Sequence, residues 1–322
     1  GGSNNLTLST GNNIAGADIL SKVAISGLGN LILADVGGTA TFNANIAAAA
    51  FTTNNTVASI NLKGASNTFT GSTIFANDGT LTIGDASSDS FAFNGGLSTT
   101  SVGGTVTLNA SSISSSNDAI AFGAVTLGSN VTIDTNATST AGDINIGAVT
   151  GGSNTLTLST GNNIANSDVT ASGAISGVTT LTLIDVGGIA SFAADVDVTT
   201  LTIGNTVANV SLTGSGSSVT NAVTFGNDGT LTIGDASGDS FTFDGGLTVS
   251  TASSTLAGSI DSSNDDITFG AITLAAATTL DTNATDTTGD IIIGAVTGAN
   301  NSLTLDTTTT TGSADITFNG DI

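Results

Sequence analysis

The stretch LTLSTGNNIANSDVTASGAISGVTTLTL, residues 156–183, begins and ends on the triplet LTL, and it decides the fold. In each triplet two leucines flank a threonine, the period of two that is typical of a strand with one buried face. Gly, Asn, Ser and Asp dominate between the triplets, and these residues favour turns. We therefore expect Leu156 and Leu158 to point inward and Thr157 outward, with a return to the same place 25 residues later.

The same step recurs elsewhere, because the threonine of the apolar–Thr–apolar triplet returns at Thr107, Thr132, Thr157 and Thr182. Three short strand-like runs per step indicate a coil whose backbone groups pair with the coils above and below. We expect an all-β chain, a right-handed parallel β-helix (β-solenoid), with about 25 residues per coil, about 13 coils and a length of roughly 60 Å. Coils at 201–231 fit the step less well, so inserted loops are expected there.

Inward-facing residues of successive coils should stack into ladders. One predicted ladder contains three aliphatic residues: Ile120, Ile144 and Val169. A second contains three phenylalanines and an isoleucine: Phe243, Phe269, Ile293 and Phe318.

A longer repeat overlies the short one. GGSNNLTLSTGNNIAGAD at 1–18 returns as GGSNTLTLSTGNNIANSD at 151–168, an offset of 150, and later in the chain the offset becomes 147. We therefore divide a single continuous solenoid, 1–322, into long repeats 1–150 and 151–297 and a partial third copy, 298–322. Each full repeat is expected to hold six coils, and residue 322 falls in phase with residues 25 and 175, where a coil closes.

The amino-acid composition excludes several classes of catalytic and metal site. The 322 residues include 25 acids, all aspartate, and two lysines, for a net charge of −23, and no His, Cys, Met, Trp, Tyr, Glu, Gln, Arg or Pro. This alphabet excludes Ser–His–Asp and Cys–His triads, ordinary zinc sites and thiol redox centres. An acidic surface repels phosphate, so we expect neither nucleic acid nor anionic membranes as partners. No apolar run reaches the ~18 residues of a membrane span.

At the level of whole coils, LTLSTGNNI, GDINIGAVT and ADITFNGDI resemble the degenerate repeats of filamentous-haemagglutinin-like and autotransporter-passenger β-helices. Those families are secreted bacterial surface adhesins. The resemblance extends over the whole chain, and it implies a β-helical shaft in an extracellular or cell-surface protein.

Aspartates recur at the step of the coil and are the candidate metal ligands. In register they would stack ~4.8 Å apart, where calcium could relieve their repulsion. The alternative is that each aspartate caps its own corner, with the repulsion screened by salt. The two predicted columns are Asp265, Asp290 and Asp315, and Asp118, Asp143 and Asp168.

A second acidic feature breaks the repeat, because Asp195 and Asp197 replace Asn45 and Ala47 of the first copy. Inverting glycosidases use two carboxylates ~6.5–9.5 Å apart, and β-helical enzymes that cut polysaccharides exist. Such enzymes also need cationic or aromatic residues that clamp the substrate, and this chain offers two lysines and only Phe. We therefore interpret the pair as structural.

Together these features predict a secreted structural protein rather than an enzyme: a β-solenoid rod, filament or adhesin shaft at the cell surface. Its expected partners are further copies, stacked head to tail through the terminal coils or joined in a longer rod, and cell-surface glycans. No cofactor is required, and Ca²⁺ is the only candidate. The alternatives are a polysaccharide-active enzyme using paired Asp and an ice- or glycan-binding solenoid. The outward neighbours of the threonine column vary, which argues against ice binding: Asp134, Ser159, Ile184 and Gly204.

Overall fold

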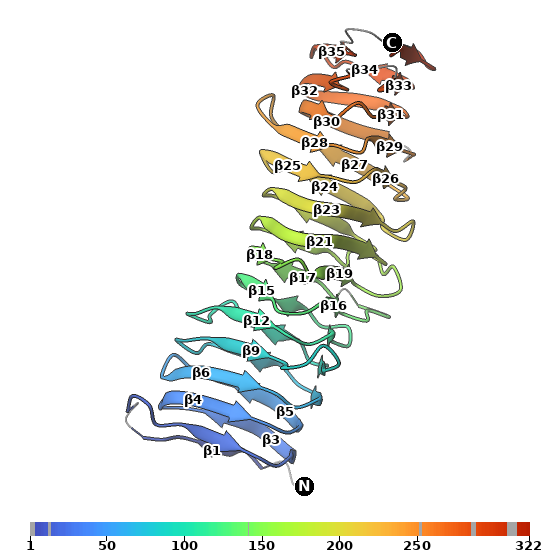
Figure 1. Ribbon diagram of the computed structural model, residues 1–322. Coiled ribbons are helices and arrows are strands. Elements are labelled where there is room, and N and C mark those ends of the chain that lie inside the picture. Colours follow the sequence, from blue (N-terminus) through green and yellow to red (C-terminus); the bar gives the residue numbers. More distant parts are fainter. Residues whose placement is uncertain (1–3, 12–13, 141, 251–252, 285–287, 308–313) are drawn as a thin grey trace.

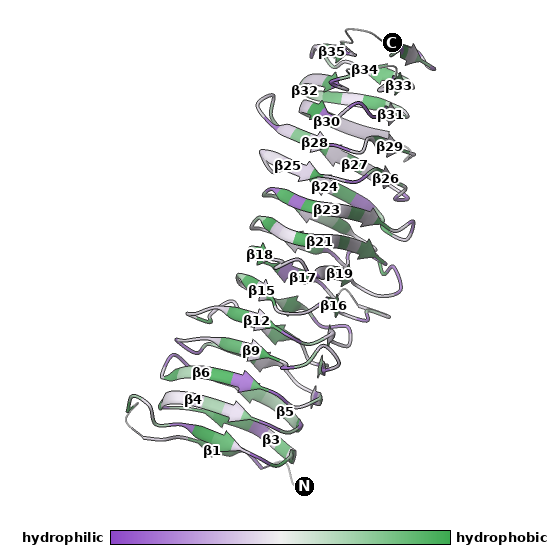
Figure 2. Ribbon diagram, viewed as in Figure 1, coloured by the Kyte–Doolittle hydropathy of each residue, from purple (hydrophilic) through white to green (hydrophobic). Residues whose placement is uncertain are grey.

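A computed structural model describes residues 4–11, 14–140, 142–250, 253–284, 288–307 and 314–322. The described residues form 36 β-strands and no helix. Strands lie in parallel on their neighbours and build an elongated rod from one terminus to the other (Figure 1). Hydrophobic and polar residues alternate along these strands (Figure 2). The predicted all-β parallel solenoid is therefore confirmed.

Three strands make one turn, so the rod has three faces. For example, β14, β15 and β16 of one turn pair with β17, β18 and β19 of the next. Face A begins with β1, face B with β2, and face C with the first half of β3. Six strands run round a corner and belong to two faces.

Face A contains β1 (Leu6–Leu8), β8 (Thr73–Ile74), β11 (Leu97–Ser98), β14 (Ile120–Ala121), β17 (Ile144–Ile146), β20 (Val169–Ala171), β22 (Ile189–Phe192), β24 (Asn209–Leu212), β27 (Thr230–Ile233) and β34 (Val296–Thr297). Face B contains β2 (Ile19–Ser21), β4 (Val36–Phe42), β6 (Val57–Leu62), β9 (Leu81–Ile83), β12 (Val106–Leu108), β15 (Val125–Leu127), β18 (Val149–Thr150), β25 (Gly216–Val219), β28 (Ser240–Phe243) and β35 (Leu303–Asp306). Face C contains β7 (Ser66–Phe69), β10 (Ser90–Phe93), β13 (Ser112–Ser114), β16 (Val131–Asp134), β19 (Thr155–Ser159), β26 (Val223–Phe225), β29 (Leu247–Val249), β31 (Ile267–Phe269), β33 (Ile291–Ile293) and β36 (Ile316–Phe318). The two-face strands are β3 (Ile25–Leu33) and β5 (Ile46–Thr52) on C and A, β21 (Ile175–Ile184) and β23 (Val196–Ile203) on B and C, and β30 (Ser253–Asp261) and β32 (Ile272–Asp281) on A and B.

The turns are shorter and more numerous than expected, about 22 residues and about 14 turns. Stacked residues are 25 apart at Leu156 and Leu181 but only 20 apart at Leu181 and Leu201. The difference lies at the corner between faces C and A, where residues 160–168 join β19 to β20 in the longer turn and residues 185–188 join β21 to β22 in the shorter one. The inserted loops expected at 201–231 are therefore wrong, because the turns here are compact.

The long sequence repeat does not hold a whole number of turns. From Leu6, the chain completes six turns on face A to reach β17, and it needs two further strands to reach Leu156 on face C. The expected six coils per repeat is therefore wrong by two thirds of a turn. Equivalent residues of the two copies consequently lie on different faces of the rod.

The strand register shows which members of the two predicted ladders stack on one another. The ladder of Ile120, Ile144 and Val169 is confirmed on face A. In the second ladder only Phe269, Ile293 and Phe318 stack, on face C. Phe243 pairs with Val219 on face B, so its place in that ladder was wrong.

The threonine column is also split between faces. Thr132, Thr157 and Thr182 stack on face C, whereas Thr107 stacks on Thr126 of face B. The step of 25 residues carries Thr107 to another face because the turn in between is 19 residues long. The array is interrupted, which agrees with ordinary strand propensity rather than an ice-binding face.

The core fills the rod from the first turns to the last as one cluster of buried aliphatic and aromatic side chains. Within it, the ring centroid of Phe51 lies 5.5 Å from that of Phe42 and 5.1 Å from that of Phe75. Phe69 stacks on Phe93 at 5.1 Å. Each turn therefore stabilises its neighbours both by backbone pairing and by apolar burial.

Candidate functional site

The first candidate site is the pair of aspartate columns at the corners. Asp143 and Asp168 do lie in consecutive turns, and the Asp168 N–H donates to Asp143 Oδ1 at 3.0 Å. Asp118 lies one residue out of register, because Ile120 pairs with Ile144. The predicted column Asp118, Asp143 and Asp168 is therefore corrected to its last two members.

The second column has a different first member. The Asp290 N–H donates to Asp266 Oδ1 at 2.9 Å, and the Asp315 N–H donates to Asp290 Oδ1 at 2.8 Å. Asp265 precedes the column by one residue, since Ile267 pairs with Ile291. The column is therefore Asp266, Asp290 and Asp315, and the predicted Asp265 is corrected.

These carboxylates act as acceptors for the backbone of the next turn. Asp18 accepts from the Thr39 N–H at 2.7 Å, and Asp168 from the Ile189 N–H at 2.8 Å. In the described part of the chain, no three acidic side chains gather closely enough to hold a metal ion. Each of these carboxylates thus holds the backbone of the adjacent turn.

Sequence reasoning missed one stack of three aspartates on face B, in which Asp261 pairs with Asp281 and Asp281 with Asp306. The available signal was an Asp directly after an apolar strand residue in each turn. Burial raises the pKa of the Asp261 carboxyl, the Ser259 hydroxyl bound at 2.8 Å lowers it, and Asp281 raises it. The Asp281 carboxylate thus repels the Asp261 carboxylate, and the hydrogen bond from the Ser259 hydroxyl partly offsets this effect on the pKa of Asp261.

The second candidate site is the pair Asp195 and Asp197, which flank the buried Val196 and therefore face the same side of the strand. Asp195 Oδ1 accepts a hydrogen bond from the Gly216 N–H at 2.8 Å, while Asp197 is exposed. Asp197 lines a shallow groove of about 300 Å³ whose other walls carry hydroxyl groups and backbone: Ser153, Gly177, Val178, Thr179, Val198, Thr199, Ser218 and Thr220.

Burial and two neighbouring residues shift the pKa of Asp197. Burial raises the pKa of its carboxyl, the Asp195 carboxylate raises it further, and a hydrogen bond from the Ser218 backbone N–H lowers it. No lysine or phenylalanine lines the groove, so a substrate would meet no cation or aromatic platform there.

The same groove occurs in the first long repeat, where it is apolar. Its volume is about 270 Å³, and its walls are Gly27, Leu28, Ala47, Ala48, Ala49, Thr68 and Thr70. Both grooves follow a break in register at a glycine with positive φ, Gly27 at 70° and Gly177 at 65°. The bulge is therefore a property of the repeat, and Asp197 is the change that makes one groove acidic.

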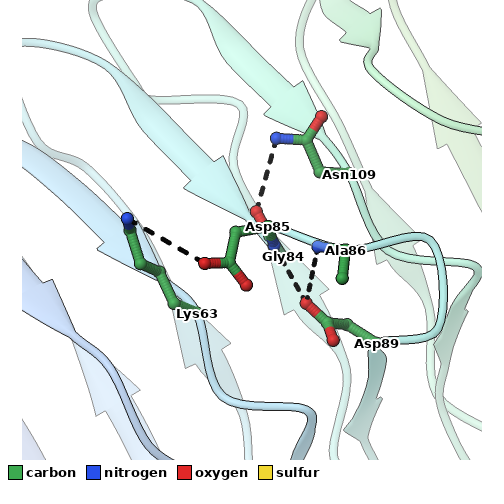
Figure 3. Close-up of polar contacts among 6 residues, drawn as sticks. All are labelled: Lys63, Gly84, Asp85, Ala86, Asp89 and Asn109. Atoms are coloured by element: carbon green, nitrogen blue, oxygen red, sulfur yellow. Dashed lines mark hydrogen bonds and ion pairs between the residues drawn. The ribbon is translucent and has the colours of Figure 1, made fainter.

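A third acidic feature is the loop between β9 and β10, shown in Figure 3. Asp89 is 3% exposed, and its Oδ2 accepts from the Asp85 and Ala86 N–H groups at 2.9 and 3.0 Å. Asp85 points outward, 3.9 Å from the Lys63 ammonium. Asp239 repeats the contact in the second copy, which marks Asp89 as a loop cap rather than a reactive group.

No protein-family model, curated protein or solved structure matches this chain. The described residues contain no helix that could cross a bilayer. The fold therefore defines the class to which the chain belongs, the parallel β-solenoids, on the strength of its own strand register.

Proposed function

We propose that this chain is a mechanical shaft: a secreted β-solenoid rod displayed at the cell surface. The observation that supports it is the continuous stack of about 14 turns around one unbroken core. Such a stack resists bending because every turn is bonded to two neighbours. Its resemblance to haemagglutinin-type repeats supports placing the rod outside the cell.

The surface chemistry fits the same role. A charge of −23 keeps rods apart in solution, and two lysines leave trypsin-like proteases only two sites. We further propose that additional coils extend the rod, either from other copies stacked head to tail or within a longer continuous rod, since the strand edges of an end coil can pair with another coil. Cell-surface glycans are the proposed target of the assembled shaft.

Electron microscopy of the purified chain tests the shaft directly. About 14 turns at about 4.8 Å predict rods roughly 65 Å long, or longer fibres of the same width. Antibody labelling of intact producing cells should stain their surface. Globular particles, or label that appears only after the cells are lysed, would contradict the proposal.

A second candidate function, cleavage of polysaccharide, is favoured by the groove at Asp197 and its raised pKa. The test is release of reducing ends from acidic and neutral polysaccharides. The enzyme hypothesis requires turnover that Asp197→Asn abolishes and that Asp89→Asn, a loop substitution on another turn, leaves intact. Equal background release by all three proteins rejects it.

A further inference from the structure

An asparagine that is followed directly by glycine is chemically labile. Asparagine amides are thermolabile groups, and a glycine without a side chain lets its backbone nitrogen approach the amide carbon of the asparagine. The sequence contains this pair at Asn94–Gly95 and at Asn319–Gly320. Asn94–Gly95 joins β10 on face C to β11 on face A, and a turn of the rod pairs with it on either side. The pair is therefore a corner inside the stack.

The corner at Asn94 is a β-turn that leaves both reacting groups without hydrogen bonds. The Gly96 N–H donates to the Phe93 carbonyl at 2.8 Å and closes the β-turn. The Asn94 N–H donates to the Phe69 carbonyl of the preceding turn of the rod at 2.7 Å. Among the described residues, neither the Gly95 N–H nor the half-buried Asn94 side-chain amide has a hydrogen-bond partner. No such bond holds the two groups apart.

Another corner of each long repeat shows the opposite arrangement. Glycine follows aspartate at Gly79 and at its counterpart Gly229. The Gly79 N–H donates to the Ala58 carbonyl at 2.6 Å, and the Gly229 N–H donates to the Ala208 carbonyl at 2.7 Å. The preceding turn of the rod thus holds these two glycine nitrogens. The unbonded nitrogen of Gly95 lies instead beside an amide that can react with it.

The second long repeat already has an aspartate at the equivalent corner. Asp244 stands in place of Asn94 and is followed by the same two glycines. Its N–H donates to the preceding turn of the rod at 2.9 Å, and the Gly246 N–H closes the β-turn at 2.8 Å. These are the two backbone bonds of the first corner. An aspartate at position 94 therefore fits the corner with its backbone unchanged.

The space at this corner distinguishes between the two products of deamidation. A Cβ atom at Gly95 would lie 2.5 Å from Gly71 Cα and 2.8 Å from the Ser72 nitrogen, so the corner lies directly on the preceding turn of the rod. Isoaspartate lengthens the main chain by one carbon, and a corner packed this closely has no room for it. Aspartate leaves the main chain as it is.

From these contacts we propose that Asn94 is a site of spontaneous deamidation and that the folded rod directs the product to aspartate. The Gly95 nitrogen loses its proton and bonds to Asn94 Cγ, the bond from Cγ to the side-chain nitrogen breaks, and ammonia leaves. Water then opens the resulting succinimide ring. Breaking the new bond to Cγ gives aspartate, whereas breaking the original peptide bond leaves the chain running through Cγ as isoaspartate. The first corner thereby acquires the residue of the second.

Timed incubation of the folded chain in mildly alkaline buffer tests the site. Peptide mapping by mass spectrometry should show Asn94 changing from an amide to an acid about tenfold faster than the exposed Asn130, which valine follows. Asn94→Gln is the matched control, because its longer side chain forms the corresponding ring much more slowly. Equal rates at Asn94 and Asn130, or an Asn94 that reacts only after unfolding in urea, would overturn the site.

The product is identified with an endoprotease that cleaves before aspartate but not before isoaspartate. Aspartate should predominate at position 94 in the folded rod, and isoaspartate in the chain incubated in urea, since unstructured peptides favour isoaspartate. A folded rod that yields mainly isoaspartate would overturn the directing role of the fold. The variant Asn94→Asp should unfold at the same urea concentration as wild type, and a lower midpoint would show that aspartate does not fit this corner.

Discussion

At the residue scale, short polar side chains of this protein accept hydrogen bonds from the backbone of the neighbouring turn. Asn45 accepts from the Ser66 N–H at 3.1 Å, and the buried Asn67 accepts from the Ile46 N–H at 2.9 Å, across one turn in each case. Asp and Asn are interchangeable in this role, because each has a carbonyl-type oxygen on a one-carbon stem. The high aspartate content follows from this use and does not by itself indicate a metal site.

Asp197 is the residue for which pH should matter. Its pKa is raised above the ordinary 3.8, so the folded chain holds this proton more tightly than the unfolded chain does. Its contribution to stability is therefore complete below that value and is lost as pH rises through the raised pKa. We expect Asp197→Asn to stabilise the rod by about 0.5 kcal/mol or less at pH 7, and not at pH 3.

Urea unfolding of wild type and Asp197→Asn at both pH values measures this difference. The reciprocal variant Ala47→Asp is the matched control, since the first groove has Asn45 where the second has Asp195. At pH 7, the aspartate introduced by Ala47→Asp should destabilise the rod less than Asp197 does, because no second carboxylate lies beside it. A stabilisation by Asp197→Asn that persists unchanged at pH 3 would show that charge is not its cause.

At the element scale, the two long repeats pack similar strands with different side chains. Phe51 lies between Phe42, Phe69 and Phe75 in the first copy, and Leu201 takes its place in the second. Phe69 is likewise replaced by Val219. The strand scaffold is thus retained with either an aromatic or an aliphatic filling.

Phe51 gives a test of core packing. Phe51→Ala should destabilise the rod by about 3–5 kcal/mol, because it empties a fully buried site. Phe51→Leu introduces the residue that the second copy already tolerates, and it should cost less than about 1.5 kcal/mol. Chemical denaturation followed by circular dichroism measures both. Similar losses for the two variants would mean that the aromatic contacts, rather than the filled volume, stabilise this turn.

At the scale of the whole molecule, the mismatch between repeat and turn distributes equivalent features around the rod. The acidic groove lies on face B, and its apolar counterpart lies on face C. A repeat of six whole turns would instead have aligned every copy along one face. A rod built this way presents its repeated loops in several directions, which suits a shaft that has no preferred side.

Charge is the whole-molecule property that salt should reveal. With 25 aspartates and two lysines, repulsion destabilises the fold, and screening shortens its reach from about 30 Å at 0.01 M salt to about 10 Å at 0.1 M. The melting temperature should therefore rise by several degrees over this range. CaCl₂ and MgCl₂ at equal ionic strength should raise it equally, and a larger effect of calcium would indicate a specific site.

The sequence by itself determined the class of fold. Alternation in triplets such as Leu156, Thr157 and Leu158 specifies which side chains are buried, and that information is local. The corner chemistry of Asn and Asp was equally readable, because these residues form turns by bonding to nearby backbone. The same local signals identified Asp143 and Asp168 as members of one column.

Only the tertiary structure decided which residues lie on which. Stacking depends on how many residues each corner uses, and that number differs from one turn to the next. That difference moved Thr107 to another face, replaced Asp265 by Asp266 and rotated the second copy by a third of a turn. Turn lengths add along the chain, so a small difference at each corner becomes a change of face, which no local pattern encodes.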